Sequence, residues 1–207
     1  LIAALCWGFH DICVRFVSQK TPISACIITV LTTGLLFHLG VMGITGGFAP
    51  LPVSAMWPAL AAGVFFVIAT FGLYAAFQRG PVRLVAPLIA SYPILSVVWA
   101  VLNGEQVAVF QWLAVLAIIV GVALVAILSD SDPGAVDTGA GTARTVVYAL
   151  IAAVGFAGTF ALGQMATAQA DELSVTLATR LVAVALNWGI VVVARRPVWP
   201  GIRALGW

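Results

Sequence analysis

Few ionisable side chains lie within the apolar stretches of this sequence, and these are the groups that could do chemistry. Asp11 and Arg15 are four residues apart, so on a helix they share one face and can form an ion pair. Trp7 extends the same stripe, and His10 adjoins it. Placing Asp or Arg at the centre of a membrane helix costs about 2.5–3.5 kcal/mol on insertion scales, so such residues are functional candidates.

Two interpretations of this cluster are open. In one, Asp11 or His10 accepts a proton whose binding depends on access to water. In the other, Asp11 and Arg15 form a structural pair near the end of the helix, and Arg15 extends toward the membrane surface. Cys6, His10 and Cys13 also share a face, but three ligands on one helix need a fourth from elsewhere, so we predict no metal site.

A second arginine, Arg180, lies in a late apolar stretch with no opposite charge within one helical turn. It could bind an anionic group of a substrate, pair with Asp11 or Glu172, or extend to the surface. His38 stands alone among apolar residues, and we expect an interior histidine with a hydrogen-bond partner. Other polar or amphipathic groups could line a mostly apolar cavity or join helices: Tyr74, Tyr92, Trp99, Thr159, Gln164 and Asn187.

The composition indicates the elements that must position these groups. The chain has 207 residues, of which 63% are hydrophobic and 8% are charged, whereas a soluble domain is ~45–50% apolar and ~25% charged. This excludes a soluble enzyme, a disordered protein and a nucleic-acid binder. The net charge of +2 gives no reason to expect an anionic macromolecular partner. We also predict no cofactor.

A membrane helix needs roughly 17–25 mainly apolar residues. Seven stretches meet or approach this length: 1–18, 23–45, 56–77, 83–103, 107–128, 145–167 and 173–194. They are continuous rather than alternating, which favours helices over a membrane barrel. Pro87 and Pro93 predict a kink in the fourth. The fold class predicted is therefore an all-α membrane bundle, with a polar linker over 129–144.

The basic residues gather on one side of this expected bundle, which we call face A. Seven of the nine fall there: Lys20, Arg79, Arg83, Arg144, Arg195, Arg196 and Arg203. The loops on the other side, face B, have none and carry Glu105, Asp171 and Glu172. Basic loops stay in the cytoplasm, so face A is predicted to be cytoplasmic and the first helix to start outside.

The chain also contains a weak internal repeat. A shift of 147 residues places Gly8-Phe9 on Gly155-Phe156 and the second stretch on the seventh. Because five helices precede the second copy, that copy enters the membrane from the opposite face, as in many transporters. The predicted organisation is a first repeat over 1–128, a linker over 129–144 and the start of a second repeat over 145–207.

Several short motifs resemble a known family. They are Ala4-Leu5-Cys6-Trp7-Gly8, Leu73-Tyr74-Ala75-Ala76, Ala86-Pro87-Leu88, Tyr92-Pro93-Ile94-Leu95, Gly104-Glu105, Gln111-Trp112-Leu113 and Gly121-Val122. As a set, these motifs resemble an EamA-type member of the drug/metabolite transporter superfamily. The resemblance implies ten helices in two five-helix repeats, of which about seven lie in this sequence. It also implies secondary transport, often export, of small metabolites or drugs. In such relatives the first helix starts inside the cell, unlike the start predicted from the charges.

The function predicted is secondary transport by alternating access, with export of small molecules and possible proton coupling. The site is expected between the first, third, fourth and sixth stretches, with the seventh nearby. The expected partners are the lipid bilayer of a bacterial inner membrane, a small-molecule substrate and protons. A membrane-embedded enzyme is one alternative, although no zinc-protease motif or nucleophile elbow is present. A seven-helix receptor is another, and its retinal form is disfavoured because the only lysine, Lys20, lies in a loop.

Overall fold

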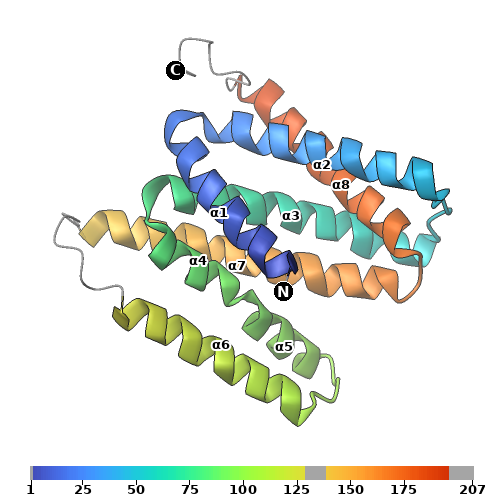
Figure 1. The fold of residues 1–207 in the computed structure, drawn as a ribbon. Helices are drawn as coiled ribbons and strands as arrows, with labels where there is room; N and C mark the ends of the chain where they lie inside the picture. The colour runs from blue at the N-terminus through green and yellow to red at the C-terminus, as the bar shows by residue number, and fades with distance from the viewer. Residues whose placement is uncertain (1, 129–138, 196–207) are drawn as a thin grey trace.

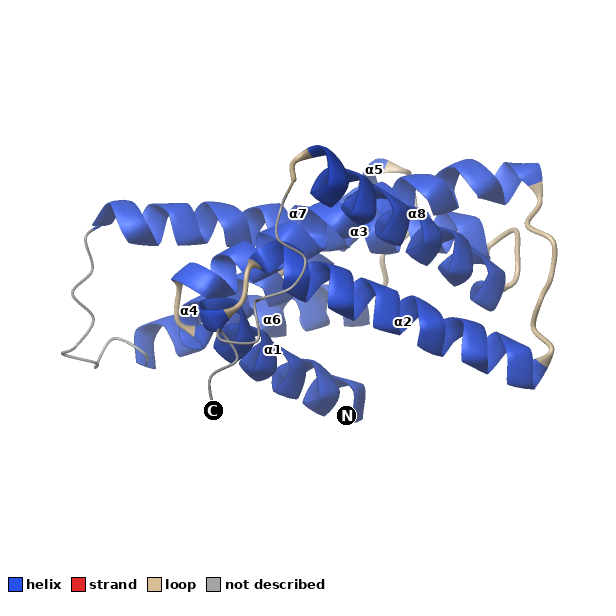
Figure 2. Ribbon diagram, turned by 90° about the horizontal axis from the view of Figure 1, so that it is seen from above, coloured by secondary structure: helices blue, strands red, loops and turns tan. Residues whose placement is uncertain are grey.

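The computed structural model describes residues 2–128 and 139–195, and within these ranges all regular structure is helical (Figures 1 and 2). The helices follow the chain in this order: α1 (Ile2–Lys20), α2 (Ile23–Thr45), α3 (Val53–Arg79), α4 (Val82–Ala90), α5 (Tyr92–Leu102), α6 (Val109–Leu128), α7 (Gly139–Thr167) and α8 (Glu172–Val193). The prediction of an all-α membrane helix bundle is confirmed. Each predicted stretch corresponds to one helix, except that the fourth is divided into α4 and α5.

The division between α4 and α5 is the predicted kink, and it has a local cause. Pro93 has no N–H group, so it cannot donate the hydrogen bond that the carbonyl of Ile89 would receive in a continuous helix. At the break, the Ser91 hydroxyl donates to the carbonyl of Leu88 at 2.6 Å. This side-chain bond satisfies a carbonyl near the end of α4. The break therefore stands where the sequence removes a backbone donor and supplies a hydroxyl.

The start of α7 differs from the prediction. The helix begins at Gly139, so residues 139–144 of the expected linker are helical. Ala143 and Arg144 have high helix propensity, and a polar turn can extend a helix beyond the apolar length needed to cross a membrane. Residues 129–138 lie outside the described part of the chain.

Helices α3 and α7 lie side by side at the centre of the bundle and have the most extensive contact in the described chain (Figure 1). Their interface is built from glycine and alanine, which let two backbones approach closely in a membrane protein. A β-carbon at Gly72 would lie 2.7 Å from the backbone nitrogen of Ala152. Ala69 and Ala76 of α3 and Ala149 of α7 are fully buried in the same core. These two helices therefore form the centre of the bundle.

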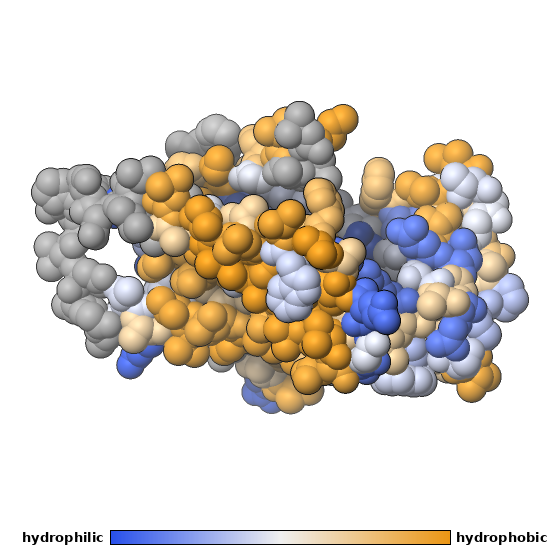
Figure 3. Space-filling model, turned by 90° about the horizontal axis from the view of Figure 1, so that it is seen from below, coloured by the Kyte–Doolittle hydropathy of each residue, from blue (hydrophilic) through white to orange (hydrophobic). Residues whose placement is uncertain are grey.

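The outside of the bundle is apolar. Phe37 is 74% exposed and Phe110 is 80% exposed. Figure 3 shows hydrophobic side chains over the middle of one face, with hydrophilic side chains gathered toward one end. Within residues 2–128 and 139–195, five helical segments are long and apolar enough to cross a membrane, with α4 and α5 taken together as one of them. An apolar surface on this scale belongs in a hydrocarbon environment rather than in water.

Side-chain contacts place two basic residues at one end of the bundle. Arg15, near the end of α1, donates to the carbonyl of Phe77 near the end of α3. The guanidinium of Arg79 lies over the ring of Tyr148, 4.8 Å from its centroid, near the start of α7. Helix α7 therefore begins at the end of the molecule where α1 finishes, and the two run in opposite directions. Of the residues assigned to face A, Arg196 and Arg203 lie outside the described residues.

Candidate functional site

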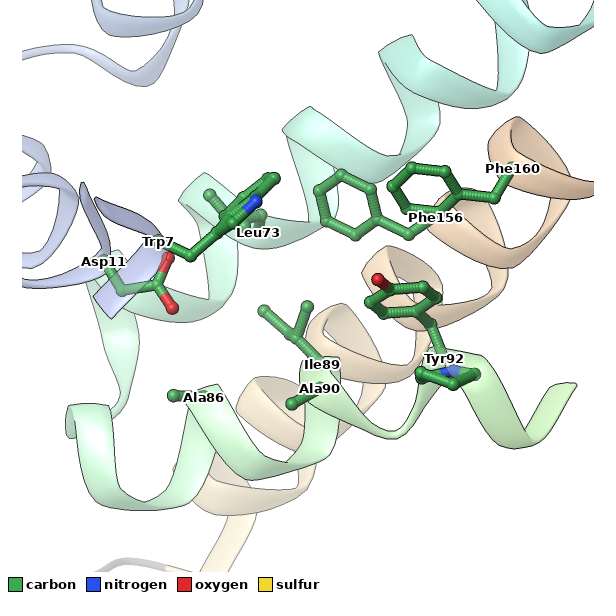
Figure 4. A pocket seen from close by; sticks show the side chains of 10 residues that line it. Trp7, Asp11, Leu73, Ala86, Ile89, Ala90, Tyr92, Phe156 and Phe160 are labelled. Atoms are coloured by element: carbon green, nitrogen blue, oxygen red, sulfur yellow. The ribbon is translucent and has the colours of Figure 1, made fainter. Parts of the chain in front are cut away.

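A cavity of about 310 Å³ lies where α1, α3, α7 and the α4–α5 break meet (Figure 4). We call it the aromatic cavity. Trp7 and Asp11 of α1 line it, together with Tyr92 at the start of α5 and Phe156 and Phe160 of α7. The proline break places Tyr92 in the wall, because α5 begins at this residue. These are the helices between which the sequence placed a site.

The rings of this cavity contact one another in defined geometry. Trp7 meets Phe156 edge to face, with centroids 5.9 Å apart and an interplanar angle of 89°. Tyr92 stacks on Phe160 with centroids 5.0 Å apart and an angle of 25°. Edge-to-face and offset-stacked arrangements are the favourable ones for aromatic pairs. The contacts connect α1, α5 and α7 through side chains that also face the open space.

Asp11 is the carboxylate in this wall, and its partner is His10 rather than Arg15. The Nδ1 atom of His10 lies 3.3 Å from Oδ1 of Asp11. Arg15 instead donates to the carbonyls of Phe77 at 2.6 Å and Gln78 at 3.2 Å. The last carbonyls of a helix lack intrahelical donors and attract a cation. Of the two interpretations left open, the Asp11–Arg15 pair is therefore not formed among the described residues, and Arg15 joins α1 to α3.

A second cavity, of about 490 Å³, lies between α7 and α8. Its lining includes Thr159 and Gln164 of α7 and Thr176 and Arg180 of α8, so we call it the polar cavity. Phe160 lines both this cavity and the aromatic one. Six of the predicted candidates thus line the two cavities, three in each: Trp7, Asp11 and Tyr92 in the aromatic cavity, and Thr159, Gln164 and Arg180 in the polar cavity.

Arg180 forms an ion pair with neither Asp11 nor Glu172 in the described part of the chain. Its Nε atom is buried and has no hydrogen-bond partner among the described residues. Its Nη1 atom lies against Gly34 of α2, where a β-carbon would be only 2.5 Å away. The pairing considered from the sequence is absent, and the glycine leaves room for the guanidinium.

Of the remaining candidates, His38 is the clearest. It is buried, and its Nε2 atom lies 2.9 Å from the carbonyl oxygen of Leu173, as expected for an interior histidine. Asn187 donates to the carbonyl of Ala183 within its own helix. Tyr74 is buried and Trp99 is half exposed, and neither lines either cavity.

Sequence reasoning did not single out Phe156, Phe160, Phe66 or Thr176 as cavity residues. Phe156 appeared only as a marker of the internal repeat, although it carries three ring contacts in addition to its contact with Trp7. Phenylalanines are common throughout the apolar stretches, so their type does not separate a cavity wall from a lipid-facing surface. Thr176 had a usable signal, because it lies four residues before Arg180 and shares its helix face.

Comparison with known proteins identifies a family. Searches of curated proteins and of solved structures gave no significant match. A family model described as the EamA-like transporter family matches residues 1–127, which is more than half of the chain. The match supports a transporter rather than an enzyme, in an integral multi-pass membrane protein with small-molecule substrates. The chain belongs to the EamA-like transporter family, within the drug/metabolite transporter superfamily.

Proposed function

We propose that the protein exports small molecules from a bacterial cell by alternating access, with protons exchanged at Asp11 and His10. The observation that carries this proposal is the position of Asp11. Its carboxyl group lines a cavity at the meeting point of α1, α3, α4–α5 and α7, and Oδ1 of Asp11 lies 3.3 Å from Nδ1 of His10. Ionisable residues facing the interior of a membrane bundle mark ion and substrate pathways.

The opposite directions of α1 and α7 support the alternating-access part of the proposal. In our interpretation, 1–128 forms one repeat and 145–207 begins a second one of inverted topology. Such repeats rock about a site near the membrane midplane, and broken helices commonly contribute to that site. The α4–α5 break and the Tyr92 side chain in the cavity wall fit this scheme. Rocking would expose Asp11 to one side of the membrane at a time.

The test uses inside-out vesicles from bacteria that overproduce the full chain. The vesicles are given a mixture of cellular metabolites and an inward-acid proton gradient, and accumulated solutes are identified by mass spectrometry. We expect accumulation of a small set of solutes that disappears with a protonophore. Asp11→Asn keeps the size of the side chain but cannot exchange a proton, so gradient-driven accumulation should be lost.

Glu105→Gln is the matched control, because it removes a carboxylate from an exposed loop on face B. It should accumulate solutes as the unaltered protein does. The proton role is wrong if Asp11→Asn and His10→Gln both retain gradient-driven accumulation. The transport proposal itself fails if vesicles with and without the protein accumulate the same solutes.

A further inference from the structure

We propose that the polar cavity is a binding subsite for an organic monoanion, whose carboxylate is held by Arg180 with Thr176 and Gln164. This extends the proposed function by naming a chemical class of substrate, and it rests on that function only for the claim that the bound molecule is transported. Three residues with unpaired side-chain donors line this one cavity, which is lined by helices α7 and α8 and by Phe66.

Arg180 supplies the charge. Its Nε atom is buried without a hydrogen-bond partner in the described chain, and no carboxylate there forms an ion pair with it. An unsatisfied buried donor carries a desolvation penalty, larger when the group is charged. A carboxylate bound in the cavity would neutralise the charge of Arg180, and a guanidinium presents its donors in a planar fork that matches two carboxylate oxygens.

Thr176 and Gln164 supply neutral donors. Thr176 lies one helical turn before Arg180, so both side chains are on the same face of α8. Neither the Thr176 hydroxyl nor the Gln164 amide has a hydrogen-bond partner among the described residues, and both line the cavity. The hydroxyls of Thr159 and Thr179 differ, since they already donate to the carbonyls of Gly155 and Ala59. The two neutral donors are thus Thr176 on α8 and Gln164 on α7, and both line the cavity together with Arg180.

Glu172 limits the charge of the ligand. It lines the same cavity and lies eight residues before Arg180, or about 12 Å along the helix axis at 1.5 Å per residue. The cavity therefore holds one positive and one negative side chain. A monoanion can contact Arg180 at a distance from Glu172. A phosphate dianion would also find only one cation in the cavity, and its second negative charge would increase the repulsion from Glu172. The carboxylate is favoured for this reason.

Binding can be measured without transport, by thermal unfolding of the full chain in detergent at constant ionic strength. The probes are benzoate, benzamide and benzylamine, which share one ring and differ in charge. We expect benzoate to raise the unfolding temperature in a saturable way, and the neutral and cationic probes to have little effect. Equal effects of benzoate and benzamide would overturn the proposal.

Two variants locate the effect. Arg180→Gln should raise the benzoate concentration for half-maximal stabilisation about tenfold or more, the loss expected for one charge-assisted hydrogen bond. Gly34→Ala keeps the charge but displaces the guanidinium, because the new β-carbon would lie 2.5 Å from Nη1. It should alter benzoate binding as well. Two controls match these variants. In Gly40→Ala, on the same helix as Gly34, the new β-carbon has no neighbour within 4 Å. Arg144→Gln removes an exposed charge on face A, and both control variants should bind benzoate as the unaltered chain does.

The outcomes separate the subsite from transport. Benzoate binding that is retained in Arg180→Gln would overturn the subsite, even if vesicles export other solutes. Binding that is selective for benzoate and lost in Arg180→Gln supports the subsite, even if vesicles accumulate nothing. Gly34→Ala keeps the test valid should Arg180→Gln fold poorly, and unchanged benzoate binding in that variant would contradict the placement of the guanidinium.

Discussion

Gly155 of α7 lies so close to Ala69 of α3 that a β-carbon on the glycine would be 2.6 Å from the Ala69 backbone nitrogen. The nearest atoms belong mostly to the α3 backbone, which cannot rotate away as a flexible side chain can. Close backbone approach of this kind drives helix association in membranes, where water does not expel apolar surface. This contact sets how closely the two central helices approach each other. Phe156 follows Gly155 in α7, so the same contact also positions Phe156 in the wall of the aromatic cavity.

Gly155→Ala should therefore destabilise the protein. Inserting a methyl group into a filled interface costs about 1–3 kcal/mol, which outweighs the gain in helix propensity of alanine over glycine, about 1 kcal/mol. Unfolding in a graded mixture of mild detergent and dodecyl sulfate measures the difference. Gly163→Ala on the same helix meets nothing within 4 Å and should be neutral or stabilising. Equal stability of the two variants would contradict the close contact.

Arg15→Met should weaken the junction between α1 and α3. The variant removes the charged donor that reaches the carbonyls of Phe77 and Gln78. Hydrogen bonds to charged groups contribute about 1.5–3 kcal/mol, and we expect a loss at the lower end because Arg15 is only partly buried. The readout is the free energy of unfolding. The control is Lys20→Met, which removes an exposed charge at the end of α1 and should leave the free energy of unfolding unchanged. If Lys20→Met loses as much stability as Arg15→Met, the loss of a positive charge alone explains the effect.

His38→Leu should loosen the start of α8. The imidazole lies 2.9 Å from the carbonyl oxygen of Leu173, and the neighbouring Ser174 hydroxyl donates to the carbonyl of Ala49 at 2.9 Å. Without the imidazole, the Leu173 carbonyl loses this partner, so the first turns of α8 should open more often. Hydrogen exchange followed by mass spectrometry should show faster exchange over 172–178. Asp171 precedes α8, and its side chain accepts a hydrogen bond from the backbone N–H of Ser174 at 3.1 Å. Unchanged exchange over 172–178 would show that this cap and the Ser174 hydroxyl hold the start of α8 without the imidazole.

Pro93→Ala should straighten the α4–α5 segment. Alanine restores the N–H that can donate to the Ile89 carbonyl, which removes the cause of the break. The Tyr92 ring would then turn away from Phe160, and the aromatic cavity would lose part of its wall. The distance between spin labels at the two ends of 82–102 should increase. The control is Pro50→Ala, in the exposed connection before α3, which should leave that distance the same. If the distance is also unchanged in Pro93→Ala, packing alone bends the segment.

The helices could be predicted from the sequence because each depends on a local property. Hydropathy located the membrane segments, and proline located the break. Partners across the bundle could not be predicted, because they depend on tertiary packing. Arg15 is four residues from Asp11, yet it bonds to carbonyls 62 and 63 residues away.

The two copies of the Gly-Phe pair show the same limit for the cavity. Phe9 is 71% exposed, whereas Phe156 is 4% exposed. The two pairs have the same sequence and lie 147 residues apart, but among the described residues Phe156, and not Phe9, contacts rings of the aromatic cavity. Its surroundings include Phe66, Tyr92 and Phe160, which lie far from it in the chain or one turn away. Residue type alone therefore does not assign a phenylalanine to a cavity wall.

Phe160 forms part of the boundary of both cavities, so the barrier between them includes a single benzyl group. A solute passing from one chamber to the other along this boundary must push that ring aside, and its stacking on Tyr92 resists the movement. The bulk of this one side chain therefore helps to keep the two cavities apart.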